Sequence, residues 1–360
     1  HSSLGMLASR AWVPMIGAAS RCMAPLWLSL KPPSQPLNHR LPPPRLQCKA
    51  MHASTTISPS SEKDMAMIKG FQRWVQRCNN GTAMLPDMTA FHIQGHDQPL
   101  GYIFHSFAEE LRRFPDVFQS PTPASLTLNP ALSSPEERSR AVDDVLKTLQ
   151  ARGLVDGWRG ELYPVAPSFH APPLLSLERA AAVHFGIKAY GVHLNGYVRL
   201  PGSGALELWV ATRSRLKPTW PGRLDHMVAG GQPQGLSCAA NIEKECWEEA
   251  GVPAELARTA VPVGAVSYAA RQAAGVKRDV LFCYDLELPL DFVPQPQDDE
   301  VEGFERWPLE RVAEGVAGGE RFKDNCNLVI IDFLLRHGYL GPDTPGYLEL
   351  LTGLRSGDCS

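Results

Sequence analysis

The chain has 360 residues and a formal net charge of −3 at pH 7, so it is long enough for two domains but lacks the basic excess that nucleic-acid binding requires. No apolar run reaches the roughly 18 residues of a membrane-spanning helix, and we expect no membrane insertion. The eight cysteines show neither a CxxC pair nor metal-ligand spacing, which indicates reduced thiols in an intracellular compartment.

Residues 1–61 differ in composition from the rest of the chain. They contain no Asp or Glu, whereas Arg and Lys are spread among many Ser, Ala and Pro residues. This acid-free, basic and hydroxyl-rich composition is typical of organelle transit peptides, and an ordinary disordered tail is the alternative. We therefore expect the folded part of the protein to begin near Glu62.

Residues 62–185 have the pattern of a small α+β domain. Apolar residues at helical spacing predict a helix over 65–78. A second helix is expected to start at Ser134, because a proline and two glutamates follow this serine directly. The other elements expected here are short strands, a hairpin and a last helix, over 92–107, 125–128, 158–165 and 174–185.

Residues 186–360 alternate strand-like runs with helices. A closing helix with a continuous apolar face is expected over 325–337. Strands, a polar helix, more strands and this closing helix predict an α/β fold with a mixed sheet between helices. The strands expected are 186–200, 206–212, 261–268, 280–288 and 303–307.

The stretch 227–252 carries the strongest chemical signal. Its glycine-rich turn leads into a helix, for which Ser237 is a suitable N-cap and Gly251 a suitable C-terminal stop. One stripe of this helix is apolar, and the adjoining stripe is acidic. The acids of that stripe are Glu245, Glu248 and Glu249. Such carboxylates repel one another unless a cation or solvent screens them, so the pattern favours a Mg²⁺ or Mn²⁺ site, with a solvated acidic face as the alternative.

The same stretch resembles the Nudix box, G-x5-E-x7-R-E-U-x-E-E-x-G-U, which is the signature of Nudix hydrolases. Gly230 matches its first glycine, and the three acids match its metal-binding glutamates. Two positions depart from the pattern: Leu236 stands in place of the first glutamate, and Lys244 in place of arginine. In the family these two side chains brace the loop against the helix, so the resemblance implies the loss of one supporting pair and not of metal ligands.

Five further segments resemble one subgroup of plant, algal and fungal Nudix proteins, which is labelled thiamine pyrophosphokinase-related. The segments are 188–198, 220–231, 278–289, 298–312 and 326–340. The resemblance implies an α/β/α Nudix sandwich over 186–360, an N-terminal α+β domain of the subgroup over 62–185, and a transit peptide over 1–61. Several plant members are plastid proteins, so we expect chloroplast localisation, with mitochondrion or cytoplasm as alternatives.

The resemblance implies hydrolysis of a diphosphate, since nothing in the chain resembles the Walker loop of a kinase. Members of the subgroup are thought to convert thiamine diphosphate analogues, above all the oxo and oxy forms, to the monophosphate. Mg²⁺ or Mn²⁺ on the three box acids would activate the attacking water. A further acid is needed to orient this water, and we expect Glu300 in that role. Glu302 is the alternate, and Asp298 and Asp299 are expected to be loop charges.

The substrate contacts are expected outside the box. The candidates for the distal phosphate are Arg271, Lys277 and Arg278. Trp220 and Tyr268 are candidates for stacking on a pyrimidine or thiazolium ring. Solvated loop residues and core aromatics are the alternatives. Three histidines lack metal-ligand spacing and are interpreted as structural: His184, His193 and His226.

Three functions remain in competition. The first is Mg²⁺-dependent hydrolysis of thiamine diphosphate analogues. The second is a Nudix diphosphatase that acts on ADP-ribose, a nucleotide sugar or another nucleoside diphosphate derivative. The third is a non-catalytic binding module with a decayed box, although retention of three mutually repelling acids argues against decay. The only partner expected is a small-molecule diphosphate, and no feature of the sequence fixes the oligomeric state.

Overall fold

The computed structural model describes residues 62–357, which belong to one compact unit. The expected transit peptide therefore lies outside the described residues. None of the helices within 62–357 combines the length and the apolar composition of a membrane span. The cysteines described there are all free: Cys78, Cys238, Cys246, Cys283 and Cys326.

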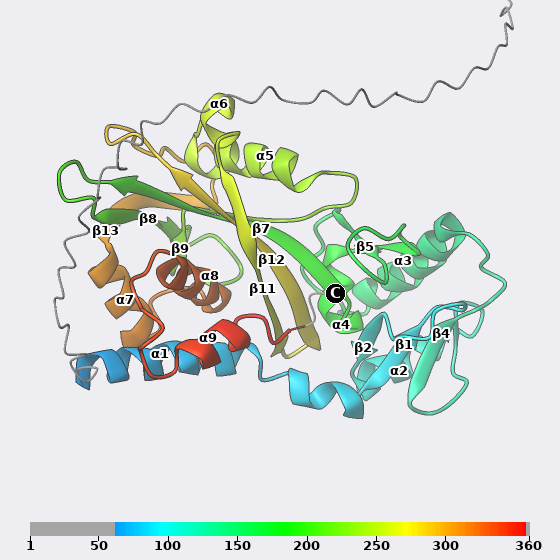
Figure 1. The fold of residues 1–360 in the computed structure, drawn as a ribbon. Helices are drawn as coiled ribbons and strands as arrows, with labels where there is room; N and C mark the ends of the chain where they lie inside the picture. Colours follow the sequence, from blue (N-terminus) through cyan, green and yellow to red (C-terminus); the bar gives the residue numbers. More distant parts are fainter. Residues whose placement is uncertain (1–61, 358–360) are drawn as a thin grey trace, which may run out of the picture. The chain divides into compact units, whose positions relative to one another are not determined.

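A mixed seven-stranded sheet is the centre of the second half of the chain (Figure 1). Its strand order is β11-β12-β7-β8-β13, with β10 beside β7 and β9 beside β8. β12 and β7 run parallel, and the other paired strands run antiparallel. The strands are β7 (Lys188–Arg199), β8 (Leu206–Arg213), β9 (Leu224–His226), β10 (Val228–Gly231), β11 (Val261–Arg271), β12 (Val276–Glu287) and β13 (Val301–Pro308).

Helices cover both faces of this sheet. On one face, α5 (Cys238–Ala250) and α6 (Ala254–Ala257) pack over an apolar cluster that includes Val192 and Leu194 of β7. The other face carries a larger cluster and four helices, α1 (Glu62–Cys78), α7 (Leu309–Gly318), α8 (Asp324–Arg336) and α9 (Tyr347–Gly353). The expected α/β/α sandwich is therefore confirmed (Figure 1).

The N-terminal region, residues 79–185, has its own sheets and apolar cluster. Its four-stranded sheet has the order β2-β1-β4-β3, and β5 pairs with β6 in a separate hairpin. The helix α3 follows Ser134 as expected, and Ser134 and Glu137 form a capping box at its start. The elements are η1 (Thr82–Asp87), β1 (Thr89–His92), β2 (Gly101–Ile103), α2 (His105–Leu111), β3 (Phe118–Gln119), β4 (Ser125–Leu128), α3 (Pro135–Ala151), β5 (Leu162–Val165), β6 (Leu175–Glu178), η2 (Arg179–Ala181) and α4 (Ala182–Phe185).

The prediction of a helix over 174–185 is wrong for the first part of this segment. Leu175–Glu178 forms β6, in which Leu177 pairs with Tyr163 of β5. Leu175 and Leu177 are both buried, so the apolar residues here follow the two-residue period of a strand. Only Ala182–Phe185 is α-helical, and Gly186 ends this helix in a left-handed conformation with φ 54°.

The first helix, α1, packs with the C-terminal helices and not with the N-terminal region. Phe71 and Trp74 are 0% exposed, and the Trp74 indole donates a hydrogen bond of 2.7 Å to the Val316 carbonyl in α7. Gly70 lies against the backbone of Ala317, where a larger side chain would clash. This packing places α1 in the core of the second half of the chain. The boundary between the two domains at residues 185 and 186 remains a proposal.

Replacing Trp74 by Ala should therefore lower the free energy of unfolding by about 3–5 kcal/mol, because it opens a cavity and leaves the Val316 carbonyl unpaired. Met65→Ala on the same helix is the matched control, since Met65 is 45% exposed. The control should change stability by no more than about 0.5 kcal/mol. Urea denaturation of both variants measures the difference, and equal small losses would contradict the packing of α1 in this core.

Candidate active site

The helix α5 begins and ends where the sequence predicts. The Ser237 hydroxyl accepts a hydrogen bond from the Ala240 N–H, which caps the first turn. Gly251 adopts φ 62° and ψ 26°, and its N–H bonds back to the last turn. Ile242 and Cys246 are buried against the sheet, so the acidic stripe next to them faces the end of β10.

Glu249 is the most deeply buried acid of the stripe. It is 7% exposed, and its Oε2 accepts a hydrogen bond of 2.8 Å from the Ala229 N–H in β10. Burial raises the pKa of Glu249 well above its usual value, against the opposing effect of this hydrogen bond. Burial also raises the pKa of Glu245, which packs directly on Gly230. Any side chain at Gly230 would occupy the space of the Glu245 carboxyl group, so the glycine allows this carboxyl group to lie against the loop.

Lys244 lies between two acids of the stripe. Its Nζ is 2.5 Å from Glu248 Oε2 and 3.3 Å from Glu245 Oε1. Glu248 is 43% exposed, so this ion pair is partly screened by water. Among the residues that the structure describes, Lys244 forms ion pairs with Glu245 and Glu248 and none of its hydrogen bonds reaches Leu236, the other departure from the box. Lys244 thus compensates part of the negative charge and has no role as a brace here.

A second acidic segment approaches the end of α5 from the loop before β13. The N–H groups of Gln295 and Gln297 each donate a 3.0 Å hydrogen bond to the backbone of the last turn of α5. Asp298 follows, and burial together with the nearby charges of Glu300 and Glu248 raises its pKa. These contacts hold five carboxyl groups near one another, those of Glu245, Glu248, Glu249, Asp298 and Glu300.

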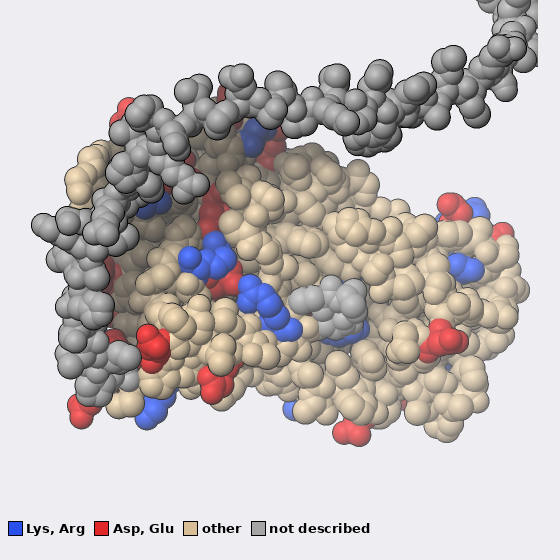
Figure 2. All heavy atoms as spheres, in the orientation of Figure 1, with Lys and Arg blue, Asp and Glu red and all other residues tan. Residues whose placement is uncertain are grey.

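Glu300 lies at the rim of this acidic cluster. Its Oε1 is 2.5 Å from Lys217 Nζ, and its side chain is 46% exposed. Burial acts to raise the pKa of Glu300, but the bond to Lys217 and the charge of Arg213 hold it below the usual value. The alternate, Glu302, instead accepts a hydrogen bond from the Arg215 N–H, and Asp299 is exposed. Figure 2 shows acidic and basic side chains next to one another at a recess in the middle of the face drawn there.

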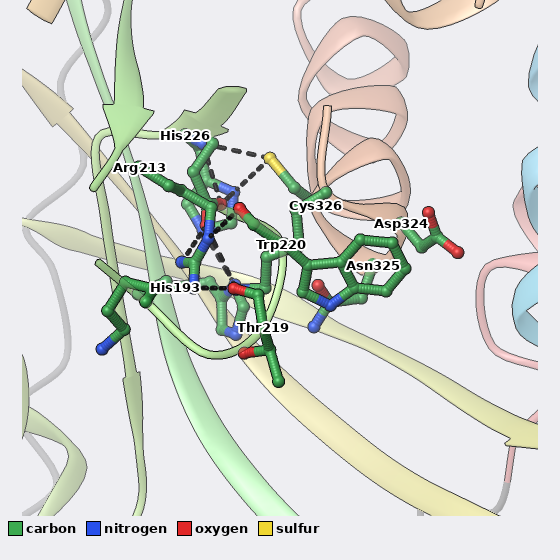
Figure 3. A network of polar contacts seen from close by, with 12 residues as sticks. His193, Arg213, Thr219, Trp220, His226, Asp324, Asn325 and Cys326 are labelled. Atoms are coloured by element: carbon green, nitrogen blue, oxygen red, sulfur yellow. Dashed lines mark hydrogen bonds and ion pairs between the residues drawn. The ribbon is translucent and has the colours of Figure 1, made fainter. Parts of the chain in front are cut away.

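A buried polar network supports β9, the strand just before β10 (Figure 3). Asp225 Oδ2 lies 3.0 Å from Arg213 Nη1 and 3.1 Å from Lys323 Nζ. The ring of His226 contacts Cys326 Sγ at 2.9 Å on one side and His193 Nδ1 at 2.8 Å on the other. The network joins β7, β8, β9 and α8 beneath the site, and no local pattern in the sequence indicates it, because bonded partners such as His226 and Cys326 are 100 residues apart.

Asp225, His226 and Cys326 lie close enough together to be considered as metal ligands. However, Lys323 and Arg213 overcome the effect of burial and hold the pKa of Asp225 far below its usual value, so its charge is already compensated. Burial lowers the pKa of His226 to about 4, so the ring is neutral at pH 7. A metal ion would add positive charge beside two cations. We therefore assign the network the structural role expected for its histidines.

Two of the expected substrate contacts are contradicted by burial. Tyr268 is 3% exposed, and its hydroxyl donates a 2.6 Å hydrogen bond to Asp279 on the sheet face that α8 covers, opposite α5. Arg278 is 8% exposed, and it donates to the Gly186 carbonyl at 3.1 Å. Both side chains are held in the protein interior. Arg271 is exposed at the end of β11, where its N–H bonds to Asn80, and within the described chain it forms no ion pair with the acidic cluster.

Trp220 lies on the loop between β8 and β9, beside the beginning of α8 (Figure 3). Its φ of 55° is the only positive value among the non-glycine residues of the described chain. The Arg213 guanidinium donates to the Trp220 carbonyl at 3.3 Å, and the Arg223 guanidinium lies 5.3 Å from the ring centre. A strained backbone held in this way is a feature of functional sites, so Trp220 remains a candidate for substrate binding.

The chain is similar to several known proteins. Residues 70–189 match a domain of unknown function, DUF4743. The chain is 46% identical to the Arabidopsis thaliana protein named Nudix hydrolase 20, chloroplastic, over 95% of each chain. It is 50% identical to Nudix hydrolase 24, chloroplastic, from the same plant, over 84% of this chain and 81% of the relative. Among solved structures, the Nudix domain of Shewanella oneidensis NrtR complexed with ADP ribose has a TM-score of 0.34 at 17% identity, covering 42% of this chain and 90% of that one.

A mixed sheet between helices, with a glycine turn and three glutamates on the helix that follows it, defines a hydrolase of the Nudix type. The identity to the two Arabidopsis proteins over most of their length shows that the chain belongs to the Nudix hydrolase family. The resemblance of the box to that of Nudix hydrolases is thereby confirmed, and the protein is an enzyme. Both relatives are named chloroplastic, which confirms the expected localisation.

Replacing Glu249 by Gln should stabilise the metal-free protein at pH 8. Folding raises the pKa of Glu249, so the protonated side chain is favoured in the folded state. As the pH rises above this pKa, the folded state must hold a buried negative charge and the free energy of unfolding falls. Glutamine removes this charge and can still accept the Ala229 hydrogen bond. We expect a gain on the order of 1 kcal/mol in the free energy of unfolding in EDTA.

We expect Mg²⁺ to raise the melting temperature of the wild type, and the same variant should lose this rise, because the charge of an expected metal ligand is gone. Glu243→Gln is the matched control, since Glu243 lies on the same helix and pairs with Arg258 at 2.7 Å outside the acidic stripe. The control should keep the Mg²⁺ response. A normal Mg²⁺ response of Glu249→Gln would rule out Glu249 as a metal ligand.

Proposed function

We propose that this Nudix hydrolase cleaves a diphosphate linkage in a small molecule, with Mg²⁺ or Mn²⁺ held by Glu245, Glu248 and Glu249. The observation that carries the proposal is the convergence of five carboxyl groups at the end of α5. Such a concentration of negative charge is unfavourable by itself and favourable around a divalent cation.

The donor atoms suit a hard cation. All of them are carboxylate oxygens, which Mg²⁺ and Mn²⁺ prefer to the nitrogen and sulfur ligands of zinc sites. The buried Glu249 has one oxygen bonded to Ala229, which leaves the second oxygen as the donor. When bound, such an ion supplies neutralisation of phosphate charge and a water of lowered pKa.

Glu300 is proposed to orient the attacking water. Its lowered pKa keeps it ionised at neutral pH, so it can accept a hydrogen bond from that water. The same low pKa makes it a weak base, so orientation is the larger part of its role. Lys217 Nζ lies 2.5 Å from Glu300 Oε1 and fixes this carboxylate at the rim of the cluster. Its positive charge can also stabilise the negative charge that develops on phosphate during the reaction.

For the substrate we propose a thiamine diphosphate analogue, with the oxo or oxy forms converted to the monophosphate. The subgroup resemblance supports this choice, and so does Trp220, because an aromatic face can stack on the pyrimidine ring and attracts the thiazolium ring of those analogues in which this ring is cationic. ADP-ribose and related nucleoside diphosphate derivatives are the second candidate class. One relative of known structure was solved with ADP ribose, although its similarity is too low to argue for that substrate here.

A phosphate-release assay over oxothiamine diphosphate, thiamine diphosphate and ADP-ribose tests this function. Turnover should require Mg²⁺ or Mn²⁺ and be highest with a thiamine-type diphosphate. Glu248→Gln and Glu249→Gln should each lower kcat by on the order of 100-fold or more, while Glu243→Gln should leave it unchanged. Absence of cation-dependent turnover on every substrate would reject the proposal.

Replacing Trp220 by Ala should raise the KM for a thiamine-type diphosphate about tenfold, because ring binding is similar in the ground and transition states and kcat is less affected. ADP-ribose is the control substrate, and its KM should change less. Leu216→Ala on the same loop is the control variant, since Leu216 is 85% exposed. Equal small effects on both substrates would exclude a stacking role for Trp220.

A further inference from the structure

The β5–β6 hairpin of the N-terminal region packs directly on the glycine loop of the box. The Gln234 N–H donates a 3.2 Å hydrogen bond to the Leu162 carbonyl, and the Ser176 hydroxyl donates at 2.5 Å to Gln234 Oε1. The Tyr163 hydroxyl lies over Gly231, where any side chain would clash with it. In Figure 1, β5 lies beside the start of β7, next to the end of the sheet at which the box loop emerges.

This hairpin brings a basic side chain to the box. Arg179 follows β6, and a Cβ atom on Gly231 would lie 3.5 Å from Cζ of Arg179. The guanidinium carbon is also 5.7 Å from the ring centre of Tyr163. Nη1 of Arg179 is 2.6 Å from Glu161 Oε2, and the side chain is 43% exposed. The other guanidinium donors make no hydrogen bond to the described residues, so they are available to a ligand.

The charge of Arg179 acts on the acidic cluster. Burial tends to raise the pKa of Glu300, and Lys217, Arg213 and Arg179 together lower it. Arg213 is already bonded to Asp225 and to two loop carbonyls, and Lys217 is bonded to Glu300. Arg179 therefore has the greatest donor capacity remaining among these cations, and it lies beside Gly231, the residue after the glycine on which Glu245 packs.

We propose that Arg179, oriented by Glu161 and Tyr163, binds a phosphate oxygen of the diphosphate substrate, so that the DUF4743 segment supplies part of the active site. A guanidinium with unused donors in a fixed orientation suits phosphate, and a partly buried site strengthens the bond. The inference rests on the proposed diphosphate hydrolysis. It gives a function to a region that, by sequence, stands apart from the box.

The competing explanation is that the hairpin only braces the box loop. Bracing depends on the Ser176 and Gln234 contact and on Tyr163, and it does not need a positive charge at residue 179. The two explanations therefore differ in what they predict for Arg179 and for Ser176. A brace affects loop geometry and lowers kcat, whereas a phosphate contact affects substrate binding and raises KM.

The test compares four variants of the full chain, Arg179→Gln, Arg179→Lys, Ser176→Ala and Arg152→Gln. Arg152→Gln is the matched control, because Arg152 pairs with Glu110 at 2.6 Å and is 40% exposed, much as Arg179 pairs with Glu161. We expect Arg179→Gln to raise KM about 10- to 100-fold with kcat changed less than about threefold. Arg179→Lys should recover part of the loss, and the other two variants should keep the wild-type KM.

A second measurement does not depend on turnover. Inorganic pyrophosphate, titrated in EDTA into each variant, should raise the melting temperature of the wild type and of Arg152→Gln but not of Arg179→Gln. The inference is overturned if Arg179→Gln behaves like Arg152→Gln in both KM and pyrophosphate binding, or if Ser176→Ala reproduces its effects. A wild type that binds pyrophosphate through Arg179 but turns over no diphosphate would reject the proposed hydrolysis and keep the anion site.

Discussion

The mutual repulsion of buried carboxylates is the constraint on which this site depends. Glu249 is 7% exposed, and its pKa is raised by burial and further by the charge of Glu245. The fold compensates these acids only in part, with the Ala229 N–H on one side and Lys244 on the other. A net negative charge remains in a partly water-free space, and this is the condition that favours a divalent cation.

In the network around Asp225, by contrast, the charge of a buried carboxylate is compensated by cations. There a buried carboxylate meets two cations, Arg213 and Lys323, and its neighbour His226 is neutral. A fully compensated network of this kind fixes geometry and offers nothing to a ligand. Because it lies under β9, next to the strand that carries Ala229, it gives the incompletely compensated acids a rigid base. Stability and reactivity are thus divided between two adjacent polar clusters.

The box loop is the place where distant parts of the chain meet. From one side the N-terminal hairpin contacts Gly231 and Gln234, and from the other the loop before β13 is bonded to the last turn of α5. A box helix with only its own caps would leave the loop without these supports. The N-terminal region has no box of its own, but its packing against the box loop helps to set the shape of the site.

The sequence by itself determined the local features of the site. Ser237, Gly251 and the acidic stripe are set by hydrogen bonds and spacing within one helix, which a periodic pattern reveals. Only the tertiary structure decided which side chains outside the box reach it. Tyr268 is aromatic and Arg278 is basic, so both are of a suitable type, yet the strand register turns their side chains into the interior. Arg179 lies in a segment whose sequence predicts a helix, and it reaches the box loop. Strand register and the packing of distant segments arise from contacts between residues far apart in the chain, and no local spacing encodes them.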